Sequence, residues 1–267
     1  MRKYLCFFRI RFIHTLQYRS AAAAGVVTQF VWGFMELLAF RAFYMADPAA
    51  FPMDFSALTS YVWLQQAFLA LFMVWLMEGD IFGTIQNGGV AYELARPLDL
   101  YMMWFVRGLA SRAAKALLRS APILLVAVLL PAPFRLTAPA GIAAAVMFVL
   151  TLALGALCVN AFCMLLYASA FYTINPMGIR IVATSLVEFL SGAVVPLPFL
   201  PERVQRLLAL TPFAAMQNLP LRCYSGNLAG KELAAGTLLQ AVWLVAMTAC
   251  GWLWMRKALR RVVVQGG

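Results

Sequence analysis

Residues 138–170 read APAGIAAAVMFVLTLALGALCVNAFCMLLYASA and contain no charged side chain. A helix needs about 20 mostly apolar residues to cross a bilayer, so this stretch is long enough for one span with an extension. The whole chain agrees, because 64% of its 267 residues are hydrophobic and only 12% are charged. A water-soluble domain of this size cannot bury that much apolar surface. The sequence therefore predicts an all-α integral membrane protein that forms a single transmembrane domain over residues 1–267.

Five further apolar stretches predict a polytopic protein with six transmembrane helices. Their bounds are 21–44, 58–77, 113–132, 179–197 and 236–255. Six spans place both termini on one side of the membrane. If the two tails and the regions 79–120 and 171–180 are cytoplasmic, 15 of the 21 Lys and Arg residues lie in the cytoplasm. The positive-inside rule favours this orientation, so we expect both termini to be cytoplasmic.

The N-terminal residues 1–20 carry an apolar stripe at helical spacing, formed by Leu5, Phe8, Phe12 and Leu16. Basic residues lie off this stripe. The pattern is typical of a helix that lies in the membrane interface. The alternative is a basic topogenic tail that includes some apolar residues.

Residues 198–235 are too interrupted by proline to span the membrane and too apolar for a free loop. Pro201 at a first helical position, with Val204, Leu207 and Leu208 on one face, predicts a short amphipathic helix. A second apolar piece follows at 212–221. We expect an external re-entrant hairpin of two short helices that dips into the outer leaflet.

The largest predicted cytoplasmic connection, residues 79–99, reads GDIFGTIQNGGVAYELARPLD. Asp80 is a candidate N-cap and the glycines at 88 and 89 are a candidate stop, so a short helix is expected over 81–87. Such a helix would show Ile81, Phe82 and Ile85 to the cytoplasm and suit docking on a soluble partner. The alternative is an ordinary solvated loop.

Two acidic residues, Glu36 and Glu188, lie inside predicted spans. A carboxylate at mid-bilayer costs about 2.5–3.5 kcal/mol on insertion scales, so both should face protein or a cavity rather than lipid. They either pair helices, with Arg41 as a possible counter-ion, or line a substrate path. Three cationic residues, Arg112, Lys115 and Arg119, share one helix face, which suits either phospholipid headgroups or acidic residues of a partner.

Motifs for catalysis and for metal binding are missing from the sequence. It has no GxxxxGK[ST] phosphate loop, no HExxH and no GxSxG, and its five cysteines form no CxxC pair. We expect no catalytic residue, no metal site and no cofactor in this chain. The net charge of +11 reflects the cytoplasmic bias of basic residues rather than a nucleic-acid partner.

Two strings resemble those of ABC-2 type permeases, the membrane subunits of ATP-binding-cassette exporters. The first is GVAYELARPLD at 89–99 in the predicted cytoplasmic connection. The second is SGAVVPLPFLP at 191–201, followed by LTPF at 210–213, which is similar to the family's fifth helix and external hairpin. The order of the predicted segments also resembles the family over nearly the whole chain.

The resemblance implies a permease of the cell inner membrane that exports a substrate. Permeases of this kind pair as homodimers or heterodimers and sit on two copies of an ATP-binding subunit, which holds ATP and Mg. The residues implied in coupling to that subunit are Asp80, Ile81, Phe82, Ile85, Gln86, Glu93 and Arg96. Membrane lipids are the other expected partners. The alternatives are an ATP-independent channel or ion-coupled secondary transporter, and a membrane-embedded assembly factor.

Overall fold

The computed structural model describes residues 2–261, and every regular element within that range is a helix. In chain order the elements are α1 (Arg2–Leu16), α2 (Arg19–Ala46), η1 (Pro48–Ala50), α3 (Phe55–Ala67), α4 (Leu69–Phe72), η2 (Val74–Leu76), α5 (Gly79–Gln86), α6 (Val90–Leu94), α7 (Leu100–Leu129), α8 (Ile142–Ala170), α9 (Met177–Leu190), η3 (Leu197–Phe199), α10 (Glu202–Ala209), α11 (Pro212–Met216), α12 (Asn218–Tyr224) and α13 (Gly230–Leu259). The predicted all-α class is confirmed for this range.

Three helices in the described range, α2, α8 and α13, are long and apolar enough to cross a membrane. α7 is as long as α13 but carries four cationic side chains, at positions 107, 112, 115 and 119. It begins at Leu100, where Asp99 Oδ1 accepts a hydrogen bond from the backbone N–H of Met102 at 2.9 Å. The helix that contains most of the expected span 113–132 therefore begins well before that span and ends at Leu129. The cationic residues at 107 and 112 do not mark a solvated helix end, because both are buried in the protein.

Two other expected spans are not continuous helices. The stretch 58–77 is divided into α3, α4 and η2, with breaks at Phe68 and Met73. The stretch 179–197 ends its helix at Leu190, and Gly192 follows with φ +83°. Glycine adopts this left-handed conformation without the steric cost that a side chain brings, so it permits the sharp turn.

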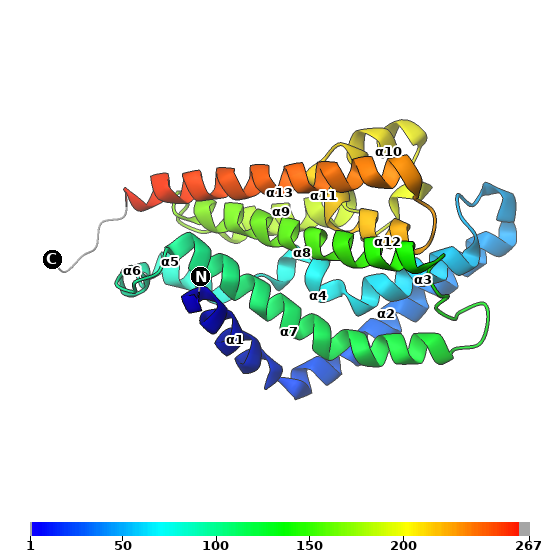
Figure 1. The fold of residues 1–267 in the computed structure, drawn as a ribbon, viewed down its shortest axis with the longest axis horizontal. Coiled ribbons are helices and arrows are strands. Elements are labelled where there is room, and N and C mark those ends of the chain that lie inside the picture. Colours follow the sequence, from blue (N-terminus) through cyan, green and yellow to red (C-terminus); the bar gives the residue numbers. More distant parts are fainter. Residues whose placement is uncertain (1, 262–267) are drawn as a thin grey trace.

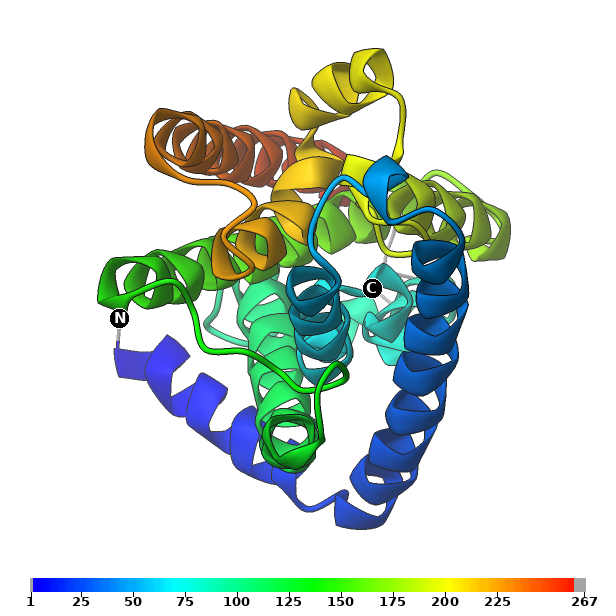
Figure 2. The ribbon, with the colours of Figure 1, turned by 90° about the vertical axis from the view of Figure 1, so that its right-hand side faces the viewer.

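The long helices form one bundle. α7 packs against α8, α13 packs along α8, and α1 packs along α7. α2 packs on α3 and α7, as the end-on view in Figure 2 shows. The start of α1, the short helices α5 and α6 and the end of α13 gather at one end of the molecule (Figure 1). The connections 47–54 and 130–141 lie at the other end.

Two large apolar clusters hold the bundle together. One joins α5, α7 and α8 around Trp104 and Tyr167, and the other joins α2, α3 and α12 around Trp63 and Leu221. Many large apolar side chains nevertheless point outward from α2, α8, α9 and α13. Exposed apolar surface of this extent is unfavourable in water and suits a lipid environment.

The N-terminal helix α1 uses most of its predicted stripe to contact protein. Phe8, Phe12 and Leu16 are half-buried on the side that packs against α7, whereas Leu5 is 69% exposed. Lys3 Nζ also donates a hydrogen bond to the carbonyl O of Pro97 at 2.7 Å. The helix is thus attached to the bundle along one face. Its outward face combines apolar and basic residues.

The proline-rich region 198–235 contains more helices than the expected pair. α10 is followed by α11 and α12, which pack on α8, and Leu219 and Leu221 are buried. The expected apolar face of α10 is only partly correct, because Leu208 is buried while Leu207 is 68% exposed. The second half of this region is therefore packed into the bundle.

Candidate functional site

The segment implied in coupling forms two short helices at one end of the bundle. α5 starts at Gly79, so Asp80 lies in its first turn and is not the N-cap that the sequence suggested. Asn87 ends α5, and Gly88 turns the chain with φ +76° into α6. The short helix expected over 81–87 is confirmed to within two residues at its start and one at its end.

The apolar face of α5 points into the protein. Ile81 is fully buried and Phe82 is 6% exposed, and the Phe82 ring packs edge-on against Tyr167 with centroids 5.1 Å apart. Ile85 packs against the same cluster. The expectation that Ile81 and Phe82 are shown to the cytoplasm is therefore wrong, and Ile85 is only half-exposed. Their burial beside α8 removes apolar surface from solvent, and the sequence alone does not indicate which way an amphipathic helix turns.

The surface exposed at this end is formed by other residues. Gln86 and Arg96 are exposed, and Tyr92 on α6 is 83% exposed. The Gln86 Nε2 group donates a hydrogen bond to the carbonyl O of Ile174 at 3.4 Å, and the Ile174 side chain is completely exposed. Tyr92 and Ile174 were not singled out in the sequence. Tyr92 lies within the string at 89–99, whereas nothing in the sequence pointed to Ile174.

Ion pairs attach the start of α5 to α7. Arg107 lies 3.0 Å from Asp80 Oδ2 and 3.5 Å from Glu78 Oε2, and Lys115 Nζ lies 3.8 Å from Glu78 Oε1. The backbone N–H of Glu78 donates to the Tyr167 hydroxyl at 2.8 Å, which adds α8.

The following helix α6 has its own polar contact with α7. The Glu93 carboxylate accepts a hydrogen bond from Trp104 Nε1. Of the residues implied in coupling, Asp80 and Glu93 therefore attach the segment to α7 through their carboxylate groups. Ile81, Phe82 and Ile85 do so by packing. Gln86 and Arg96 remain on the surface.

The two acids predicted inside the spans line one cavity of about 760 Å³. Glu36 comes from α2 and Glu188 from α9, and the remaining walls come mainly from α2, α3, α4 and the residues around η2. Glu36 Oε2 accepts a hydrogen bond from Gln66 Nε2 at 3.5 Å, whereas its Oε1 is buried and has no hydrogen-bond partner in the described residues. Neither acid forms an ion pair within residues 2–261. Arg41 instead lies over the Phe134 ring, 4.9 Å from its centroid.

Glutamine amides accompany these acids, and the sequence analysis missed them. Gln29 is only 4% exposed, and both polar atoms of its side chain lack a partner among the described residues. Gln65 Nε2 donates to the carbonyl O of Ala193 at 2.9 Å, and Gln217 Nε2 donates to Gln65 Oε1 at 3.1 Å. Buried polar atoms without partners are rare, so Gln29 and Glu36 are the groups that a bound molecule could satisfy. The available signal was polar residues within apolar stretches.

The chemistry of this cavity is that of binding. Carboxylates and amides accept and donate hydrogen bonds, and apolar side chains such as Trp32, Met35 and Trp75 complete the walls. Within residues 2–261, no three His, Cys, Asp or Glu side chains come together as a metal site. All five cysteines are free thiols.

Comparison with known proteins identifies the chain's family. The model of a family described as ABC-2 family transporter protein matches residues 30–266, which is most of the chain. A search of curated proteins finds no match. Members of this family are membrane transport components rather than catalytic chains, and they normally work with an ATP-binding subunit. The chain belongs to the ABC-2 transporter family.

Proposed function

We propose that this protein is the permease subunit of an ATP-driven exporter in the cell inner membrane. The observation that carries the proposal is the family match over residues 30–266. The chain supplies the path, and a separate ATP-binding subunit, present in two copies, supplies the hydrolysis of ATP with Mg. A second permease subunit, identical or related, completes the assembly.

In this proposal the chain crosses the membrane six times, through α2, α3 to η2, α7, α8, α9 and α13. Both termini and the helices α5 and α6 are cytoplasmic. The grouping of α5, α6, the start of α1 and the end of α13 at one end of the molecule supports this arrangement (Figure 1). The excess of Lys and Arg in the segments assigned to the cytoplasm supports it independently. The opposite end, with α10, is external.

The ATP-binding subunit docks on the end surface formed by Gln86, Tyr92, Arg96 and Ile174. This surface is exposed, and it includes an aromatic ring, an aliphatic side chain and a guanidinium group. Aromatic residues and arginine are the types that contribute most at protein interfaces. The remaining coupling residues, including Asp80, act by holding this surface against α7 and α8.

The cavity with Glu36 and Glu188 forms part of the transport path. Glu36 makes a polar contact with α3 only through the 3.5 Å hydrogen bond from Gln66, and its other carboxylate oxygen and the Gln29 amide have no partner in the described residues, which supports a role in the path in addition to that contact. The apolar walls favour an amphipathic substrate, and the two acids favour one that bears a positive charge or hydrogen-bond donors.

Purification and reconstitution test the proposal. The tagged chain should copurify in mild detergent with an ATP-binding subunit, and the chain alone should hydrolyse no ATP. Vesicles containing the assembled complex should hydrolyse ATP, and transport should require it. A pure chain that hydrolyses ATP would contradict the proposal, and transport in vesicles without ATP would instead support the channel or ion-coupled alternative.

A further inference from the structure

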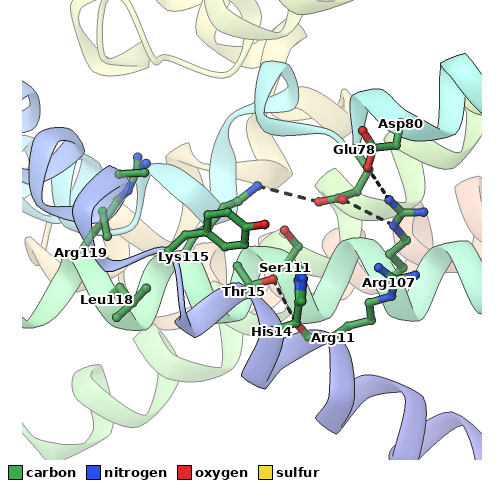
Figure 3. A pocket seen from close by; sticks show the side chains of 13 residues that line it. Arg11, His14, Thr15, Glu78, Asp80, Arg107, Ser111, Lys115, Leu118 and Arg119 are labelled. Atoms are coloured by element: carbon green, nitrogen blue, oxygen red, sulfur yellow. Dashed lines mark hydrogen bonds and ion pairs between the residues drawn. The ribbon is translucent and has the colours of Figure 1, made fainter.

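Arg119 of α7 is a cation without an acidic partner in the described residues. It forms no ion pair within residues 2–261, and its Nε atom is buried without a hydrogen-bond partner there. Figure 3 shows it apart from the ion pairs that Arg107 and Lys115 form with the acids around the start of α5. A charged residue inside a membrane protein normally pairs with another charge or marks a binding site or path. Arg119 is therefore a candidate for binding an anionic group from outside the chain.

The Arg119 guanidinium lies against α2, on the wall of the cavity that contains the two glutamates. A Cβ added at Gly25 would approach Arg119 Cζ to 2.7 Å and Nε to 2.9 Å, so the glycine leaves the space that the guanidinium occupies. Gly25 and Arg119 both line the cavity of about 760 Å³, together with Glu36 and Glu188. The same cavity thus presents one cation and two acids that form no ion pair in the described residues.

Four lining residues of α2 run along one face of the helix from the cation to an acid. Gly25, Gln29, Trp32 and Glu36 are spaced i, i+4, i+7 and i+11, which is the spacing of a single helical stripe. At a rise of about 1.5 Å per residue, Glu36 lies about 16 Å beyond Gly25 along the helix axis. The cation and this acid are therefore at opposite ends of the stripe, with the Trp32 ring between them.

The second acid lies at the same end of the cavity as Glu36. Glu36 accepts a hydrogen bond from Gln66, and the neighbouring Gln65 donates one to the carbonyl O of Ala193. The backbone N–H of Ala193 in turn donates to the carbonyl O of Glu188 at 3.1 Å. Consecutive residues of α3 thus join the segments that carry the two acids.

At the other end, Gln29 adds amide groups beside the cation. It lies one helical turn from Gly25, is only 4% exposed, and has no partner for either polar atom of its side chain in the described residues. Its amide N–H groups can donate to the same anionic group as Arg119. Guanidinium and carboxylate groups form charge-assisted hydrogen bonds with groups of opposite charge, and these are stronger than hydrogen bonds between neutral groups.

We propose that this cavity binds a bipolar molecule, whose anionic end is held by Arg119 and whose ammonium end is held by Glu36 and Glu188. An apolar segment joins the two ends and lies along Trp32. A cavity of this volume suits a ligand of drug-like size. The inference rests on the proposed function, in which the cavity is part of the transport path, and it names the class of substrate.

Isothermal titration calorimetry of the purified full chain in detergent, with empty micelles as the blank, tests the inference. The probes are 12-aminododecanoic acid, its isomer 2-aminododecanoic acid, dodecylamine and dodecanoic acid. The two isomers contain the same atoms, but only the first has its charges at opposite ends of the chain. We expect it to bind about tenfold more tightly than each of the other probes, because each of these can make only one of the two charged contacts.

Variants assign each end of the ligand to its residues. Arg119→Gln should weaken the binding of 12-aminododecanoic acid about tenfold and leave that of dodecylamine unchanged, since the amine needs only the acids. The double variant Glu36→Gln/Glu188→Gln should weaken 12-aminododecanoic acid and leave dodecanoic acid unchanged. Arg135→Gln, which removes an exposed cation that does not line the cavity, is the control and should bind every probe as the wild type does.

The inference is overturned if no probe binds, if the two isomers bind the wild type equally, or if Arg119→Gln leaves the affinity for 12-aminododecanoic acid unchanged. The comparison of isomers needs no variant, so it remains decisive if a substituted protein fails to fold. A negative result would leave the copurification and ATP-dependence tests unaffected and would not count against the proposed function. Selective binding by a chain that transports without ATP would instead support the site and contradict the exporter.

Discussion

Arg112 Nη1 donates a hydrogen bond to the carbonyl O of Met73 at 2.8 Å, at the point where α4 ends and the second predicted span is broken. The same nitrogen also donates to the carbonyl O of Ala70 at 3.2 Å, and Nη2 donates to Cys163 Sγ at 3.2 Å. A buried cation in α7 therefore satisfies backbone groups that the broken helix leaves unpaired. Irregular backbone within a membrane protein is tolerated where protein covers it in this way.

Replacing Arg112 with methionine should destabilise the protein. The carbonyl groups of Ala70 and Met73 would lose their donor, and each buried unsatisfied group costs about 1–3 kcal/mol. The midpoint of thermal unfolding in detergent should fall by several degrees. Arg135→Met, at an exposed position, is the control and should leave the midpoint unchanged. An unchanged midpoint for Arg112→Met would show that the break does not depend on this side chain.

Phe82→Ala should destabilise the junction between α5 and α8. The ring is buried and packs on Tyr167, and truncation of a buried phenylalanine typically costs about 3–5 kcal/mol. Thermal unfolding followed by size-exclusion chromatography measures the loss. If the variant unfolds as the wild type does but no longer binds the ATP-binding subunit, the Phe82 ring faces that subunit and its burial in the structure is contradicted.

Tyr92→Ala should have the opposite pattern. The side chain is exposed, so its removal should leave stability nearly unchanged. Association with the ATP-binding subunit should weaken, by about 1–2 kcal/mol or more for a central aromatic side chain at an interface. The measurement is the amount of subunit that copurifies with the tagged chain. Leu210→Ala, an exposed apolar truncation beside α10, serves as the control. Equal recovery of the subunit with both variants would argue against the end surface as the docking site.

Glu36→Gln separates a transport role from a helix-pairing role. If the Glu36 carboxylate pairs helices, its replacement should weaken that contact and lower the midpoint of thermal unfolding. We expect the midpoint to stay the same or rise, because glutamine has a similar shape and avoids the cost of burying a charge. Glu202→Gln, at an exposed position that pairs with Arg206, controls for loss of an acidic group elsewhere. A lower midpoint for Glu36→Gln alone would assign the residue to structure.

Gly155→Ala should be strongly destabilising. A Cβ at this position of α8 would collide with the backbone carbonyl O of Met216, which cannot move away as a flexible side chain can. Overpacking of this kind typically costs about 1–3 kcal/mol. Gly178→Ala in α9 is the matched control, because no atom lies within 4 Å of its Cβ position. That change should be neutral or stabilise by up to about 1 kcal/mol, since alanine is the better helix former. Equal effects of the two substitutions would contradict the close approach of α8 to α11.

The sequence predicted the parts of the fold that depend on local pattern. The uncharged stretch 138–170 contains α8, and the glycine at 88 marks the end of α5. It did not predict where α7 begins, because the solvation of a cation depends on distant residues. Arg107 is paired by Glu78 and Asp80, and Arg112 by carbonyl groups across the bundle.

For the candidate sites too, local pattern was visible in the sequence, whereas the arrangement of distant residues was not. Glu36 and Glu188 were identified as costly groups within apolar stretches, but only the structure places them on one cavity. The direction of the apolar face of α5 was also beyond the sequence, since Ile81 and Phe82 would suit a partner surface as well as the core. Gln29 also lies within an apolar stretch, but only the structure shows that both polar atoms of its side chain are buried without a partner among the described residues.

The two short helices α5 and α6 cannot move independently of the bundle. Glu78, Asp80 and Glu93 contact α7, and Phe82 contacts α8. The two short helices are therefore rigidly attached to the bundle and do not form a mobile segment. A displacement of Tyr92 by a bound partner would be transmitted directly to α7 and α8, the two long helices that α5 and α6 contact. Small displacements at this end of the bundle would then tilt whole helices rather than refold a loop.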